Sequence, residues 1–170
     1  MKKVASAILA VLGSVGGCTA DAAHAIYTNR LNVLTATLAA NGVTLDKTVP
    51  DAREGAIRID ANGPMTIHLA DIQPEGGERV ILTYRGHLRT AQLRGRAFLE
   101  MRCDTPVNAR RVEFAAQAEA VSGSSGWVSQ TARCIPADGR PAQHAVLNVV
   151  VDGIGTVWVR NIALFEQRLR

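Results

Sequence analysis

From residue 43 onward, short apolar segments alternate with sequences that favour turns. These turn sequences are Asn62-Gly63-Pro64, Pro74-Glu75-Gly76-Gly77, Asp104-Thr105-Pro106, Gly123-Ser124-Ser125-Gly126, Asp138-Gly139 and Asp152-Gly153. Glycine, proline, asparagine and aspartate suit the backbone angles and local hydrogen bonds of turns. Turn signals this frequent favour an antiparallel β-sandwich or barrel over strands that alternate with helices. We therefore predict an all-β fold, a β-sandwich of about eight or nine strands.

The segments between the turns alternate in polarity as half-buried strands do. Val80, Leu82 and Tyr84 share one face of their segment, and Leu99 and Met101 share one face of another. With an apolar fraction of 47%, the chain has enough apolar residues to build a core. The predicted strands are 43–46, 56–60, 65–69, 79–88, 96–103, 112–121, 127–134, 145–152 and 156–166.

The N-terminus has the pattern of an export signal. Lys2 and Lys3 precede an apolar run over 4–15, which has secretory length and is too short for a comfortable membrane span. Residues 15–18, Val-Gly-Gly-Cys, resemble the lipobox of bacterial lipoproteins, which implies a lipid-anchored Cys18. By the same resemblance, Thr19 after the cysteine implies the outer membrane, facing the periplasm.

A second cleavage site leaves an alternative open. Ala23-His24-Ala25 fits an Ala-x-Ala signal, and cleavage there would release a soluble periplasmic or secreted protein that begins at Ile26. We favour the lipoprotein, with a signal peptide over 1–17, a tether over 18–42 and the β-sandwich over 43–170. Leu31, Leu34 and Leu38 have helical spacing, and Asn41-Gly42 is a typical helix stop, so the tether could contain a short helix.

Cysteine usage agrees with export. Lipidation of Cys18 leaves Cys103 and Cys134, each at the end of a predicted strand. In an oxidising compartment such a pair predicts a disulfide. The bridge would close a loop of about 30 residues and stabilise the fold by about 3 to 4 kcal/mol.

Four segments, taken in order, resemble galactose-binding-like jelly-roll domains. They cover 86–90, 95–102, 127–136 and 155–164, and the whole likeness extends over about residues 53–166. The resemblance implies a jelly-roll β-sandwich in which Trp127 and Trp158 are buried, with Ile162 and Leu164 seating the last strand on the core. Such domains include carbohydrate-binding modules, accessory domains and units without a known ligand. Some hold a structural calcium through acidic residues, and Arg160 argues against that site here.

The candidate binding face is polar and lies on strands predicted to be neighbours. Its residues are Arg85, His87, Glu100, Arg102 and Asn148. Arginine forks suit carboxylates, phosphates and acidic sugars. The alternative is a solvated sheet face with weak surface ion pairs.

Other chemistries lack a sequence signal. The four histidines form no zinc motif, no serine occupies a Gly-x-Ser-x-Gly turn, and no phosphate loop is present. No basic run supports nucleic-acid binding, since the formal charge is only +4 and includes both leader lysines. We predict no catalytic residue, no metal and no cofactor.

The sequence therefore predicts a non-enzymatic envelope lipoprotein that binds a glycan or an acidic polymer. Its other partner would be the membrane, through the lipid anchor. The alternative function is a structural or protein-interaction subunit, with an envelope protein as its partner and no small ligand.

Overall fold

The computed structural model describes residues 22–74, 80–107, 110–135 and 142–169. The predicted leader and Cys18 lie outside these residues. The described strands form one antiparallel sheet, and none of the described helices is long and apolar enough to cross a membrane. The elements are β1 (His24–Asn29), α1 (Ala36–Ala40), β2 (Thr44–Asp46), β3 (Ala56–Asn62), β4 (Met65–Ile72), β5 (Val80–Val107), β6 (Arg110–Gln117), β7 (Val121–Cys134) and β8 (His144–Arg168).

Two long strands, β5 and β8, form the centre of the sheet. They pair from Val80 opposite Arg168 to Asp104 opposite His144. Strands β4, β3 and β1 follow one another along the free edge of β8, and β2 extends β3. Strands β7 and β6 flank the other side of β5.

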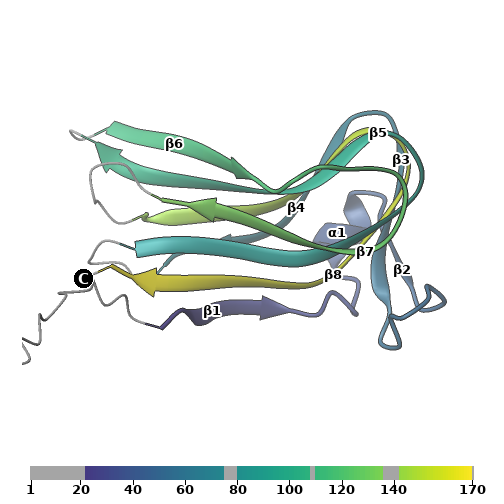
Figure 1. The fold of residues 1–170 in the computed structure, drawn as a ribbon, viewed down its shortest axis with the longest axis horizontal. Helices are drawn as coiled ribbons and strands as arrows, with labels where there is room; N and C mark the ends of the chain where they lie inside the picture. The colour runs from purple at the N-terminus through teal and green to yellow at the C-terminus, as the bar shows by residue number, and fades with distance from the viewer. Residues whose placement is uncertain (1–21, 75–79, 108–109, 136–141, 170) are drawn as a thin grey trace, which may run out of the picture.

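The sheet folds over on itself where β5 and β8 cross at close range. The register between them shifts after Ala91, and Gly95 then lies directly opposite Gly153. Both glycines have positive φ, and a Cβ on either would clash with the backbone of the facing strand. Glycine is therefore required at this crossing. Figure 1 shows the long strands curving at this end of the molecule, which turns one sheet into two layers.

The first layer contains β1 and the segments 80–91 of β5, 125–134 of β7 and 156–168 of β8. The second layer contains β4, β6 and the segments 94–107 of β5 and 144–153 of β8. The all-β sandwich predicted from the turn spacing is thus confirmed, together with a short N-terminal helix.

Alternating apolar residues from both layers form the core. Leu82, Tyr84 and Leu88 come from the first half of β5, and Leu99 and Met101 from the second half. A Cβ at Gly86 would lie 2.9 Å from the Leu99 side chain, so the two halves of β5 face each other across the core. From β8 the core receives Leu147, Val149, Val151, Val157, Val159, Ile162 and Leu164.

The predicted disulfide is confirmed. Cys103 and Cys134 are bonded, with their Cα atoms 6.7 Å apart and both residues buried. Cys103 belongs to the second layer, opposite Ala145, whereas Cys134 belongs to the first layer, opposite Leu82. The bridge therefore joins the layers far from the glycine crossing.

Several predicted strand boundaries are wrong. Residues 80–88, the described part of the predicted strand 79–88, and residues 96–103 are parts of the single strand β5, and 145–152 and 156–166 are parts of β8. Residues 123–126, predicted to be a turn, lie within β7. Glycines in these segments mark bends and register shifts inside long strands, which produce the same local sequence signal as turns.

The segment assigned to a tether is partly built into the sandwich. Residues 24–29 form β1, which pairs with the C-terminal part of β8. The helix covers only Ala36–Ala40, where Thr35 caps its first turn by accepting a hydrogen bond from the Leu38 backbone nitrogen. Asn41 ends the helix, as predicted, and Gly42 follows with φ +73°.

The two tryptophans do not join the main core, contrary to the expectation from the resemblance. They lie on the outer face of the first layer, half-buried against a second cluster of Val49, Ala52 and Ala56. The Trp158 Nε1 donates to an Asp46 carboxylate oxygen at 2.9 Å. Ile162 and Leu164, by contrast, face the main core as expected.

Candidate functional site

The five predicted binding residues do not form one face. Arg85 and His87 lie in the first layer, whereas Glu100, Arg102 and Asn148 lie in the second. The prediction fails because β5 folds over between these two groups. Side chains that point outward before the fold and after it therefore end on opposite surfaces of the sandwich.

The second layer carries a row of polar side chains across four neighbouring strands. His68, Asn148, Glu100 and Gln117 come from β4, β8, β5 and β6 and are direct partners in the sheet register. Asn148 donates to one Glu100 oxygen at 3.3 Å, and Gln117 donates to the other at 3.3 Å. His68 Nδ1 lies 3.4 Å from the Asn148 amide oxygen. We call this row the polar ladder.

Charged pairs border the polar ladder on one side. His68 Nε2 lies 2.8 Å from Asp71, and His144 Nε2 lies 3.2 Å from the same carboxylate. Arg102 forms an ion pair with Glu113 on the next strand, and this hydrogen-bonded pairing raises the pKa of Arg102. These contacts hold the border groups in place around Asn148, which is only 4% exposed at the centre of the face.

An apolar patch borders the ladder on its other side. Phe98 is buried beneath the Arg96 guanidinium, which lies 5.6 Å from the ring centroid. Arg96 also forms an ion pair with Asp152 at 3.2 Å. A depression of about 410 Å³ lies here, between Phe98, Thr66 and Val150. The ladder face thus combines fixed hydrogen-bonding groups with an adjacent apolar surface.

Arg85 and His87 lie on the outer face of the first layer. The Arg85 guanidinium stacks over Phe165, 5.0 Å from the ring centroid. Partial burial, with the charge of Arg160 as a second cause, lowers the pKa of His87. Because its register partner is Arg160, His87 belongs with the arginine cluster described next.

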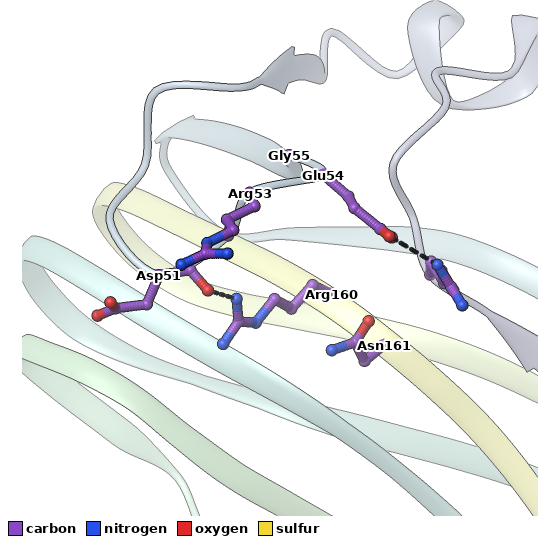
Figure 2. A pocket seen from close by; sticks show the side chains of 8 residues that line it. Asp51, Arg53, Glu54, Gly55, Arg160 and Asn161 are labelled. Carbon is purple, nitrogen blue, oxygen red and sulfur yellow. Dashed lines mark hydrogen bonds and ion pairs between the residues drawn. The ribbon is translucent and has the colours of Figure 1, made fainter.

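A loop over residues 47–55 forms a second depression, of about 400 Å³, on this outer face (Figure 2). The Arg160 guanidinium lies 4.0 Å from the centroid of the Trp127 ring and donates to the Asp51 carbonyl oxygen. Arg30 pairs with Glu54 at 2.7 Å across the depression. We call this depression the arginine pocket; its lining residues are Arg30, Asp51, Ala52, Arg53, Glu54, Gly55, Arg160 and Asn161.

Several residues of the polar ladder and of the arginine pocket were not predicted from the sequence. His68 belongs to no histidine motif in the sequence, although its alternation with the buried Ile67 indicates an outward side chain. The sequence gives Gln117 no motif, and Arg53 lies between the predicted strands 43–46 and 56–60. No pattern within 47–55 indicated that this loop would pack over the tryptophans. Among the described residues, no group of three or more histidine, cysteine or acidic side chains is arranged to hold a metal ion.

No protein-family model matches the sequence, and no curated protein matches it. Solved structures do resemble it. With the CBM22-1 xylan-binding domain of Paenibacillus barcinonensis Xyn10C, the TM-score is 0.52 at 15% identity, covering 89% of this chain and 97% of that one. At this identity the likeness establishes a shared β-sandwich fold.

Two further structures are more distant. TmCBM61, solved with beta-1,4-galactotriose, gives a TM-score of 0.47 at 12% identity, covering 74% of this chain and 82% of that one. The enzymatically active domain of bacteriophage CBA120 tailspike protein 4 gives 0.49 at 14% identity, covering 72% of this chain. The match spans only 17% of the length of that tailspike chain.

Proposed function

We propose that the protein is a non-catalytic module that binds a neutral glycan on the polar-ladder face. The observation that carries this proposal is the hydrogen-bonded row of His68, Asn148, Glu100 and Gln117 across four strands. Sugar hydroxyls both donate and accept, and amide, imidazole and carboxylate groups match them in direction and spacing. The fold shared with a xylan-binding domain supports the same proposal.

The charge on this face favours a neutral ligand over an acidic polymer. Glu100, Glu113 and Asp71 are acidic, and the Arg102 charge is already engaged by Glu113. A polyanion would meet these carboxylates at close range, whereas hydroxyl groups would donate to them in charge-assisted hydrogen bonds. The half-buried Val150, which lines the depression next to Phe98, would contact the C–H face of a sugar ring.

A glycan screen on the purified, disulfide-bonded protein tests the proposal, with neutral β-1,4-linked xylo- and galacto-oligosaccharides as the first probes. For the best binder, Glu100→Ala is expected to weaken affinity by about tenfold, which is ~1.4 kcal/mol. The matched control is Arg85→Ala, which removes a charged side chain from the opposite surface and should leave the affinity unchanged. Titration calorimetry of the three proteins gives both values.

Two outcomes of these measurements would contradict the proposed site. If the well-folded protein binds no glycan, or if Arg85→Ala and Glu100→Ala weaken binding equally, the ladder is not the site. A blank screen would favour the alternative, a protein-interaction subunit, and co-purification with a stoichiometric partner would then be the observation to seek.

We further propose that the protein works at the cell envelope, held by a lipid on Cys18. The lipobox-like residues 15–18 and the disulfide between Cys103 and Cys134 support export to an oxidising compartment. The expected result for Cys18→Ala is a shift from the membrane fraction to the soluble fraction, with loss of the acyl mass from the N-terminal peptide. A mature N-terminus at Ile26 would instead support the soluble form.

A further inference from the structure

The walls of the arginine pocket come from three separate parts of the chain. Arg30 follows β1, Arg53 lies in the 47–55 loop, and Arg160 and Asn161 lie on β8. At Asn161 the register of β8 with β5 shifts, so that His87 faces Arg160 while Arg85 faces Ala163. The Asn161 backbone nitrogen donates to the Arg30 carbonyl oxygen at 3.1 Å, which joins two of the walls.

Strained backbone holds this arrangement. Asp51 and Asn161 have φ values of +63° and +50°, a region that non-glycine residues seldom occupy. Both residues line the same pocket. Strain of this kind persists where the surrounding structure requires it, and it concentrates at binding sites.

The Arg160 guanidinium is fixed in position, but not all of its N–H groups have hydrogen-bond partners among the described residues. Its plane lies over Trp127, and one terminal nitrogen donates to the Asp51 carbonyl. Its buried Nε has no hydrogen-bond partner in the described part of the chain. A guanidinium already held in place loses little conformational freedom when it binds a ligand.

Arg53 supplies a second, uncommitted cation. Its side chain is exposed and makes no hydrogen bond or ion pair with the residues that the structure describes. Figure 2 draws the Arg53 and Arg160 head groups toward the same end of the pocket, whereas Glu54, the ion-pair partner of Arg30, points toward the other end. Because Arg30 pairs with Glu54, the charges that remain in the pocket are two positive ones, on Arg53 and Arg160, and the negative Asp51 carboxylate, which leaves one net positive charge.

We propose that the arginine pocket binds the carboxylate of an acidic sugar residue, as a second site separate from the polar ladder. Two guanidinium groups match a carboxylate in charge and geometry, and the Asn161 amide beside them suits a ring hydroxyl. A volume of about 400 Å³ is sufficient to hold one sugar unit. The inference rests on the proposed function only in taking the ligand to be a saccharide.

Galacturonate and glucuronate are the probes, with galactose, glucose, acetate and inorganic sulfate as comparisons, titrated into the full chain and followed by backbone amide NMR. Uronates are expected to shift the signals of Arg53 and Asn161 and to bind more tightly than all four comparison compounds. Arg53→Gln should weaken uronate binding at least tenfold, since it removes an unengaged charge without disturbing packing. Arg85→Gln, an exposed arginine elsewhere on the same layer, should leave it unchanged.

A second variant tests the other arginine of the pocket independently of Arg53. Arg160→Lys keeps the charge but removes the planar fork, and it should also weaken uronate binding. Uronates that bind no better than neutral sugars would overturn the inference. Equal binding of acetate or sulfate would also overturn it, because it would show a site for small anions only.

The same titration separates this inference from the proposed function. Glu100→Ala should leave uronate binding unchanged while it weakens neutral-glycan binding by about tenfold. Uronate binding without any neutral-glycan binding would contradict the ladder and leave the pocket standing. Neutral-glycan binding without uronate binding would do the reverse.

Discussion

Charged side chains on the two outer faces differ in how many hydrogen-bond and ion-pair partners they have. On the second layer, Glu100 accepts from two amides and Arg102 is paired with Glu113. On the first layer, Arg160 stacks on Trp127 and its Nε lacks a partner among the described residues. The complete pairing is the basis for proposing hydroxyl groups as ligands of the ladder, and the incomplete pairing is the basis for proposing an anion as the ligand of the arginine pocket.

His87 is expected to make the stability of the protein depend on pH. Burial, reinforced by the Arg160 charge, holds the pKa of His87 below its ordinary value of 6.5. The unfolded chain therefore binds a proton at this residue at a higher pH than the folded chain does. The stability from neutral His87 is complete above about pH 6.5 and is lost as the pH falls from there through the lowered folded pKa.

We expect the free energy of unfolding to depend less steeply on pH below 6.5 in His87→Gln than in the original protein. Urea unfolding at several pH values measures this slope. An NMR titration of the His87 ring checks the cause directly. A measured pKa at or above 6.5 in the folded protein would contradict the account of this residue.

The residues of the proposed binding faces could be predicted in part from the sequence. Alternation correctly placed Glu100 and Arg102 on the outer face of one strand, and it correctly grouped Asn148 with them. It could not show that Arg85 belongs to the opposite surface, because local alternation gives the side of a strand and carries no information about a later fold of that strand. Pairing with His68 and Gln117 depends on contacts with other strands and was equally hidden.

Among the structural elements, the long strands β5 and β8 determine where both sites lie. Their crossing at Gly95 and Gly153 places the ladder on one layer and the arginine pocket on the other. Of these two glycines, the sequence marks only Gly153 as a turn signal, and turn composition alone does not distinguish a chain reversal from a bend that two paired strands share. The apolar faces of the strands were therefore predicted correctly, apart from the two tryptophans, whereas the connectivity of the strands was not.

Gly153→Ala should destabilise the protein by about 3 kcal/mol, because the new Cβ would meet the backbone of Arg94 and the residue has φ +156°. Gly63→Ala is the matched control, since a Cβ there meets nothing within 4 Å and no unusual φ is required. Thermal unfolding of both variants measures the difference. Equal melting temperatures would show that the crossing tolerates a side chain and that the two layers are held together otherwise.

For the whole molecule, the glycine crossing and the disulfide act at different places to keep the two layers together. The bridge between Cys103 and Cys134 spans 31 residues of sequence and connects one layer to the other. Strand β1 also contributes to the first layer, because it pairs with β8 and forms the edge of that layer. Both surfaces therefore depend on one folded sheet. Of the two features that hold the layers together, the disulfide was predicted correctly from the sequence.

The double variant Cys103→Ser, Cys134→Ser is expected to lower the free energy of unfolding by about 3 to 4 kcal/mol, since the unfolded chain regains the entropy of an open loop. Denaturant unfolding of the variant and of the oxidised protein measures the loss. If reduction leaves the unfolding midpoint unchanged, the bridge contributes little and the core alone holds the layers together.

Glycan recognition by the polar ladder is the central claim, and chemical-shift mapping tests it most directly. The best neutral oligosaccharide from the screen is titrated into isotopically labelled protein, and the perturbed amide signals are placed on the structure. The account predicts that the largest shifts cluster at His68, Glu100, Gln117 and Asn148, on the outer face of the second layer. Shifts that cluster instead around Arg85 and Phe165, on the opposite layer, would contradict it.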